Sequence, residues 1–440
     1  MIARWLSLGL AASLACAQSD YKTDLAHPRL LLPQRRAKLV KRERERQSMR
    51  WAAFETFAKG KVNWPEPGFA LSLYHVATES EEPGRQAIQW ALGPGTDLRQ
   101  IAIVFDWCQA LLSDAERTRL ADKIRQGLEK STAMDLPSIR TRAMAAVAIN
   151  GHVDGVGAKY LQPIVENWWR KDVIVKVKAG GNPIELRDHM ALFELLHVMR
   201  DNFDIDLRED AAKYFTTLPV FHILAHYPAP YPAGENDYRI PLMKLHGEPD
   251  AREAARSRAG ALMMVSYDNN AQEMQFVQGW LMQDRFLMKG AYGIPYEYLW
   301  ANPYQPGLSF HYLPNVFHDA ASGRLLIRSA WDDDAVWFYQ SEGLMQMFKD
   351  GQIVNIQSVR EPIVMGNTTL LPAALANKFK AGAEEASRYY VIGLEPASRY
   401  DIEVEDEDIR EQTTDRGGVL ELAFPAKRSA VVLVRASPGK

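Results

Sequence analysis

The chain has 440 residues, of which 47% are hydrophobic and 24% are charged, a composition typical of folded domains and not of disordered chains. This length exceeds what one core usually supports, so we expect two or three domains. The formal net charge is only −3, which excludes the strong positive field typical of nucleic-acid-binding proteins, and we expect no nucleic acid partner.

The N-terminal residues 1–17 have the order of a secretory signal peptide. Arg4 is followed by an apolar stretch, and the small residues Ala15 and Ala17 flank Cys16 where a cleavage site is expected. We predict cleavage after Ala17 and export to the periplasm or the extracellular space; attachment of a lipid to Cys16 is the weaker alternative. No later run has the length of a membrane span.

The segment from about residue 33 to about residue 285 has a helical pattern throughout. We expect roughly ten to twelve helices joined by short connections, which favours antiparallel neighbours. One boundary is explicit, because Ser113 and Glu116 stand in the spacing of a capping box. No fixed-period repeat is visible, so a ring of helical hairpins is favoured over a regular solenoid.

After about residue 303 the pattern changes to short β-rich runs separated by Gly, Asp and Asn turns. The predicted organisation is therefore a helical domain over residues 24–300 and an antiparallel β-sandwich over residues 301–440. The region from Leu371 to Ser387 reads as helical or irregular, and a small accessory β-module can begin at about residue 388.

Four stretches carry a resemblance to a known family. They are HPRLLL, VFDWCQALLSDAERTRLADKI, GGNPIELRDHMALFELLHVMRDNFDIDL with YPAGENDYR after it, and FHDAASGRLLIRSAWDDDAVWFYQSEG. In order and spacing they resemble the heparinase II/III-like polysaccharide lyases. The resemblance implies an incomplete (α/α) toroid of helical hairpins, a β-sandwich behind it and an acidic polysaccharide bound between them. The sequence departs from the family early in its β-region, where Met345 and Met347 stand at positions that histidines usually occupy.

Cleavage beside a uronic acid by β-elimination requires a group that offsets the substrate carboxylate, a base for the C5 proton and an acid for the leaving oxygen. Glu185 and His189 are spaced i and i+4, so on one helix Glu185 can orient the imidazole and His189 can act as the base. The alternative is that Glu185 and Asp188 only favour a helix N-terminus. This chemistry requires no cofactor and no metal ion.

The connection that ends in Asp237, Tyr238 and Arg239 supplies further candidates. Tyr238 can exchange a proton, Arg239 can bind a carboxylate with its planar guanidinium, and Asp237 can contact the sugar. The alternative interpretation is a surface turn whose arginine pairs with a nearby acid.

Three more residues are candidate substrate ligands: Asn150 and His152 at a helix boundary, and Trp331 as a platform for a sugar ring. A helix stop explains Asn150 equally well. His222 and His226 lie one turn apart, but no third ligand accompanies them, so no metal site is predicted.

These observations predict an exported enzyme that cleaves an acidic polysaccharide by β-elimination. Two alternatives stay open: a catalytically inactive relative that only binds glycans, and a toroid glycoside hydrolase that uses Glu185 or Asp188 with Asp237 as paired acids.

Overall fold

The computed structural model describes residues 21–23, 26–60, 62–229, 231–232, 237–238, 240–241, 250–283, 288–341, 343–405 and 408–437. The predicted signal segment, residues 1–17, lies outside these ranges. None of the helices in the described ranges combines the length and the apolar character that crossing a bilayer requires.

Six helices form an inner ring. They are α3 (Pro67–Thr78), α5 (Leu98–Trp107), α7 (Leu136–Ile149), α9 (His189–Phe203), α11 (Ala251–Tyr267) and α13 (Gly293–Trp300). Each contacts the next in this order, and α13 contacts α3, which closes the ring. Because the chain returns along the outside between successive members, all six run in the same direction and begin at the same end of the ring.

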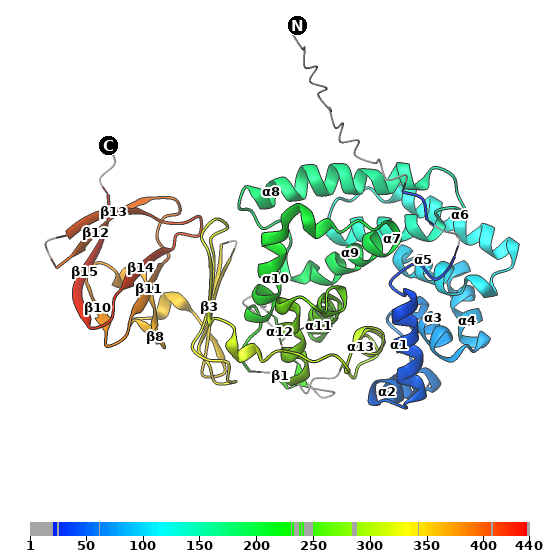
Figure 1. The fold of residues 1–440 in the computed structure, drawn as a ribbon, viewed down its shortest axis with the longest axis horizontal. Helices are drawn as coiled ribbons and strands as arrows, with labels where there is room; N and C mark the ends of the chain where they lie inside the picture. Colours follow the sequence, from blue (N-terminus) through cyan, green and yellow to red (C-terminus); the bar gives the residue numbers. More distant parts are fainter. Residues whose placement is uncertain are drawn as a thin grey trace, which may run out of the picture.

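The outer helices cover this ring (Figure 1). They are α1 (Gln34–Glu45), α2 (Met49–Lys59), α4 (Glu81–Leu92), α6 (Asp114–Lys130), α8 (Ile174–Lys178), α10 (Ala212–Leu224) and α12 (Gln272–Gln283), with the π-helical turns η2 (Gly157–Leu161) and η3 (Ile164–Val173) before α8. The predicted capping box is present at α6, where Ser113 and Glu116 bond each other's backbone N–H groups. The inner helix α5 is buried from Arg99 to Trp107, in agreement with its nearly uniform apolar pattern.

The C-terminal part is built of three sheets. The first contains β3 (Val316–Asp319), β4 (Arg324–Arg328), β5 (Trp337–Ser341), β6 (Leu344–Lys349) and β7 (Gln352–Val354); the second contains β14 (Leu420–Phe424), β11 (Ser387–Ile392), β9 (Thr368–Pro372) and β8 (Ile363–Met365); the third contains β10 (Phe379–Ala383), β15 (Arg428–Ala436), β12 (Arg399–Val404) and β13 (Asp408–Thr413). In these sheets all pairs are antiparallel except β9 with β11.

The three sheets lie on one another as layers (Figure 1). Successive side chains of a strand point to opposite faces of its sheet, so each strand can pack against two different layers. In β4, Leu326 packs with the helices, whereas Leu325 and Ile327 pack against the second sheet. In β11, Tyr390 faces the first sheet and Tyr389 faces the third. The order of layers is therefore helices, first sheet, second sheet and third sheet.

The predicted fold class, a toroid of helical hairpins followed by a β-sandwich, is confirmed. The region from Leu371 to Ser387 contains the 3₁₀ turn η8 (Ala373–Leu375) and the strand β10. The strands after residue 388 share their sheets with β8, β9 and β10, because the parallel pairing of β9 and β11 joins both sides of this region.

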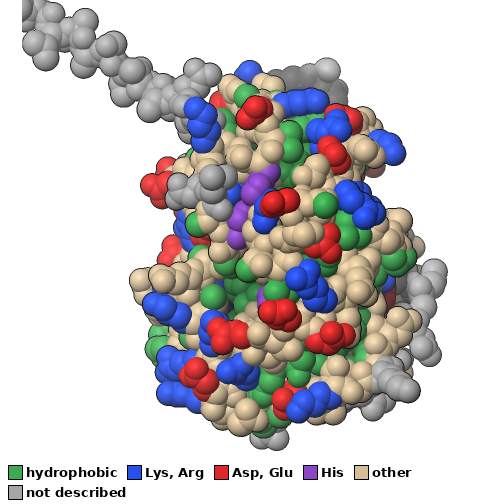
Figure 2. All heavy atoms as spheres, turned by 90° about the vertical axis from the view of Figure 1, so that its right-hand side faces the viewer, with side chains coloured by type: hydrophobic (Ala, Val, Ile, Leu, Met, Phe, Trp, Pro, Cys, Tyr) green, Lys and Arg blue, Asp and Glu red, His purple; other side chains and the backbone are tan. Residues whose placement is uncertain are grey.

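The surface of the helical part carries charges of both signs, in agreement with the low net charge of the chain. Figure 2 shows one face of the helical part, on which basic and acidic side chains are interspersed and neither sign forms an extended patch.

An ionic contact joins the first and second sheets. His318 of β3 lies 2.9 Å through Nε2 from Asp415 Oδ2 and 2.9 Å through Nδ1 from Glu421 Oε2 on β14. Burial disfavours the charged imidazole, but the hydrogen bonds to the two carboxylates outweigh this effect and raise the pKa of His318 above its ordinary value.

This contact predicts a pH-dependent stability. Because the folded-state pKa lies above the unfolded value of about 6.5, the stabilisation is complete below that pH and is lost as the pH rises through the folded-state pKa. The free energy of unfolding of the His318→Gln variant, measured by urea denaturation, should fall below that of the unmodified protein by on the order of 1 kcal/mol in acid, and the difference should shrink in alkali. His75→Gln is the control, since His75 bonds a backbone carbonyl and not a carboxylate. A difference for His318→Gln that stays constant with pH would contradict the assignment.

Candidate functional site

A cavity of about 720 Å³ lies where the inner helices begin. The starts of all six inner helices contribute residues to its walls. Five of these residues directly precede a helix, namely Glu66 (α3), Asp97 (α5), Asp135 (α7), Asp188 (α9) and Tyr292 (α13). The sixth, Arg252, lies in the first turn of α11. Helix N-termini carry positive partial charge and free N–H groups, so their convergence favours an anionic or strongly polar ligand.

A buried charge network forms the floor of this cavity. Glu194 of α9 is fully buried and accepts hydrogen bonds from Arg99 Nε at 3.1 Å, from Arg99 Nη2 and from Arg140 Nη1. Glu66 lies 3.5 Å from Arg99 Nη1 and accepts a 2.5 Å hydrogen bond from the Tyr296 hydroxyl. This network ties α3, α5, α7, α9 and α13 together at one point.

Tyr292 and two arginines form one side of the rim. Arg256 Nε donates to the Tyr292 hydroxyl at 3.4 Å, and the Arg252 guanidinium lies 4.9 Å from the centre of the Tyr292 ring. Glu253 accepts a 2.5 Å hydrogen bond from Arg256 Nη1. Burial raises the pKa of Tyr292, so its phenol remains protonated at neutral pH and can donate a proton.

Asp188 supplies a second group able to transfer protons. Burial, reinforced by the neighbouring Glu185 carboxylate, raises the pKa of Asp188 to about 6. A carboxyl group with this pKa exchanges protons close to neutral pH, as a general acid or base must. Glu185 and Arg187 also line the cavity and pair with each other at 2.7 Å.

His189, the predicted base, does not line the cavity and lies in the interior of the helical domain. Its side chain is fully buried, its Nδ1 is 2.9 Å from Nδ1 of His222, and burial lowers its pKa to about 3. The expected i, i+4 pairing with Glu185 does not form because Glu185 precedes a 3₁₀ turn, η4 (Leu186–Asp188), and α9 begins only at His189. The structure therefore brings Glu185 to the cavity and leaves His189 in the interior.

The predicted substrate ligands Asn150, His152 and Trp331 lie elsewhere. Asn150 ends α7, at the opposite end of that helix from the cavity, and donates from Nδ2 to the backbone oxygen of Tyr21 at 2.6 Å. His152 lies 3.0 Å from His27 through the two Nε2 atoms. Trp331 is 8% exposed and donates to the backbone oxygen of Leu313. Each has a packing role, which does not support the predicted substrate contact.

The remaining candidates belong to the connection before α11. Asp237 and Tyr238 form the short strand β2 (Asp237–Tyr238), which pairs with β1 (Tyr231–Pro232). Their side chains and all of Arg239 lie outside the described residues, so their roles stay predictions.

The sequence interpretation missed Arg140, Arg252, Arg256 and Tyr292. A usable signal was present, because Arg99, Arg140 and Arg252 each follow within five residues an aspartate that caps an inner helix, namely Asp97, Asp135 and Asp250. A cation in the first turns of a helix is electrostatically unfavourable, so its recurrence at three helix starts points to a shared site. Among the described residues, no group of three or more His, Cys, Asp or Glu side chains is arranged to hold a metal ion.

Comparisons with known proteins give distant likenesses only. No family model matches the chain, and no curated protein matches it. A heparan sulfate lyase, HepC from Pedobacter heparinus, is 10% identical over 85% of this chain and 76% of its own, with a TM-score of 0.37. A mutant of that lyase has a TM-score of 0.36 at the same identity and coverage, and a glycoside hydrolase has a TM-score of 0.32 with 9% identity over 96% of this chain and 79% of its own. Likenesses this weak do not choose between lyase and hydrolase chemistry.

The floor network predicts a large effect of one substitution. Glu194→Gln leaves Arg99 and Arg140 buried without their shared carboxylate, which should lower the free energy of unfolding by about 3 kcal/mol or more. Glu166→Gln is the matched control, because Glu166 forms an exposed i, i+4 pair with Arg170 and should change stability far less. Equal effects of the two substitutions in urea denaturation would refute the structural role of the network.

Proposed function

We propose that the protein is an enzyme that cleaves an acidic polysaccharide by β-elimination in the cavity at the starts of the inner helices. The observation that supports this proposal is the presence, around one cavity, of five arginines, a protonated tyrosine and an aspartic acid with a pKa of about 6. The arginines are Arg99, Arg140, Arg187, Arg252 and Arg256, and Lys176 is a further cation of the lining.

The arginines suit recognition of a uronic acid. Arg99 and Arg140 already share Glu194, Arg187 pairs with Glu185 and Arg256 pairs with Glu253. Arg252 on the rim is therefore the cation best placed to bind an additional carboxylate. A guanidinium pairs with a carboxylate through two parallel hydrogen bonds. Offsetting the carboxylate charge stabilises the carbanion-like transition state that forms when the C5 proton leaves.

Asp188 and Tyr292 would carry the two proton transfers. The Asp188 carboxylate takes the C5 proton, the electron pair of that bond forms the C4–C5 double bond, and the C4–O bond breaks. Tyr292 donates its phenolic proton to the departing glycosidic oxygen. In this scheme Asp188 takes the role that the sequence gave to His189, and Tyr292 takes one of the roles given to Tyr238.

Hydrolysis is the second candidate, and the raised pKa of Asp188 beside Glu185 favours it. A protonated Asp188 would act as the general acid, and another carboxylate of the cavity, Asp135 or Glu253, would activate water or attack the sugar.

Product analysis separates these functions. The protein is incubated with hyaluronan, heparan sulfate, chondroitin, alginate and pectate, and both the absorbance near the ultraviolet edge and the reducing ends are measured. New absorbance with new reducing ends is the expected result, because elimination creates an unsaturated uronate. Reducing ends without absorbance would replace the proposal by hydrolysis, and binding without either product would indicate a glycan-binding protein.

Substitution of Tyr292 tests the acid. Tyr292→Phe should lower kcat by about 100-fold or more, because proton transfer by a positioned group contributes roughly that factor. Tyr312→Phe is the control, since Tyr312 is 85% exposed and outside the cavity. Unchanged turnover in Tyr292→Phe would remove this residue from the scheme.

The pH profile tests the role of Asp188. As a base it must be ionised, so kcat/KM in elimination should rise with pH through a value of about 6, the pKa of Asp188. As a general acid in hydrolysis it must be protonated, so the rate would fall over the same range. Asp188→Asn should remove this limb of the profile, whereas Asp332→Asn, an exposed carboxylate of the β3–β7 sheet region, should leave it unchanged.

A further inference from the structure

A second cavity, of about 650 Å³, lies at the other end of the ring. One wall is α1, and the other is formed by Asn269 and Asn270, which follow the end of α11, and by the segment 302–306, which follows the end of α13. Because these segments follow the C-terminal ends of inner helices, this cavity is separate from the candidate active site at their N-terminal ends. Its volume is within the range of roughly 300–1,000 Å³ typical of ligand sites.

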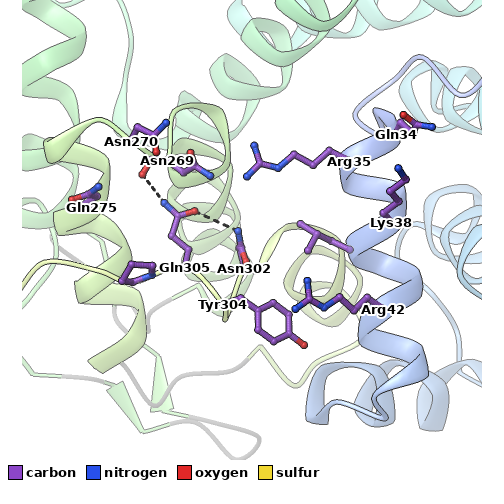
Figure 3. A pocket seen from close by; sticks show the side chains of 12 residues that line it. Gln34, Arg35, Lys38, Arg42, Asn269, Asn270, Gln275, Asn302, Tyr304 and Gln305 are labelled. Atoms are coloured by element: carbon purple, nitrogen blue, oxygen red, sulfur yellow. Dashed lines mark hydrogen bonds between the residues drawn. The ribbon is translucent and has the colours of Figure 1, made fainter.

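The α1 wall carries three cations on one face. Arg35, Lys38 and Arg42 are spaced i, i+3 and i+7 and all line the cavity, and Figure 3 shows Arg35 and Arg42 extending into it from α1. Within the described ranges, none of the three forms an ion pair with a carboxylate, and the residues that line the cavity include no Asp or Glu. The first turn of α1 also lacks an acidic residue, so the positive end of this helix is not offset there.

The opposite wall consists of amides held in place. Gln305 Nε2 donates to the backbone oxygen of Asn269 at 2.6 Å, and Asn302 Nδ2 lies 3.4 Å from Gln305 Oε1 (Figure 3). The buried Gln278 fixes the same segment by donating to the backbone oxygens of Asn302 and Gln305, both at 3.1 Å. The side-chain oxygen of Asn302 is buried without a hydrogen-bond partner in the described part of the chain.

An aromatic ring completes the site. The guanidinium of Arg42 lies 4.3 Å from the centre of the Tyr304 ring, and the Tyr304 hydroxyl donates to Glu43 at 2.7 Å. These contacts hold Tyr304 in one orientation beside the cations, where its ring can contact a sugar ring.

We propose that this cavity is a non-catalytic binding site for an anionic oligosaccharide. Arg35, Lys38 and Arg42 bind its sulfate or carboxylate groups, and the amides bind its hydroxyls. Among the described residues, the lining contains no carboxyl or imidazole group, so the role that we assign to the cavity is binding and not catalysis. This inference takes only the class of ligand, an anionic oligosaccharide, from the proposed function.

The experiment measures binding with turnover removed. In the Tyr292→Phe background, a size-defined sulfated heparin oligosaccharide and an unsulfated oligouronate of equal length are titrated calorimetrically at two salt concentrations. Adding Arg35→Gln and Lys38→Gln should raise Kd at least about tenfold for whichever oligosaccharide binds, since two charge-assisted contacts are lost. If the sulfated oligosaccharide shows this effect, the anionic group that is bound is sulfate; if the unsulfated oligouronate shows it, the group is carboxylate.

Two controls make the result specific. Lys41→Gln with Arg44→Gln removes the same charge from α1 at positions that do not line the cavity, and it should change Kd far less. Gln275→Ala should weaken oligosaccharide binding and leave the binding of inorganic sulfate unaffected. Equal losses in the two double variants would overturn the proposal in favour of non-specific attraction, as would the absence of binding by both oligosaccharides.

The outcome is independent of the catalytic proposal. With Tyr292 intact, the Arg35→Gln/Lys38→Gln variant should retain kcat on a short substrate. A protein that binds the oligosaccharide through α1 but cleaves no polysaccharide would keep this inference and remove the proposed function, whereas cleavage with unchanged Kd in the variant would do the reverse.

Discussion

The carboxylate of Glu194 is the constraint on which the helical domain depends. A buried charge is costly unless it is paired and fully hydrogen-bonded, and this one is shared by Arg99 of α5 and Arg140 of α7 while belonging to α9 itself. Three consecutive inner helices must therefore begin at the same level for the network to form. That alignment creates the cavity, because a shift of any one of them would leave a charge unpaired in the interior.

The N-terminal ends of the inner helices carry arginines as well as the groups that compensate for them. An arginine near a helix N-terminus opposes the helix dipole, and α5, α7 and α11 each carry one within five residues of an aspartate cap. The caps and the carboxylates Glu66, Glu194 and Glu253 offset this cost. Charges of both signs are thus held close together around one cavity. Burial there, reinforced by the neighbouring Glu185 carboxylate, raises the pKa of Asp188 toward neutrality.

Local chemistry in the sequence predicts the architecture well and the site poorly. The capping box at Ser113, the apolar α5 and the alternation of β4 and β11 are properties of neighbouring residues, so they can be read directly. The position of His189 depends on a 3₁₀ turn of three residues and on burial against α10, which no local pattern encodes. Asn150 follows the end of α7, as the alternative of a helix stop predicts. The candidate cavity lies at the other end of the ring, because helix starts meet at one end and helix stops at the other.

The two ends of the ring differ in the chemistry that they offer. At the helix starts, cations are mixed with carboxyl groups and a tyrosine, so charge can be both bound and moved. At the helix ends, the cations of α1 face amides and the Tyr304 ring, and the described lining contains no carboxyl group, so the role proposed for this cavity is binding alone. A polymer exceeds either cavity in length, and binding energy obtained away from the reacting bond can be used to position that bond. The two proposed roles, proton transfer at one end of the ring and binding at the other, therefore fit a long anionic chain. A small neutral substrate would use neither the cations of α1 nor the arginines on the rim of the first cavity.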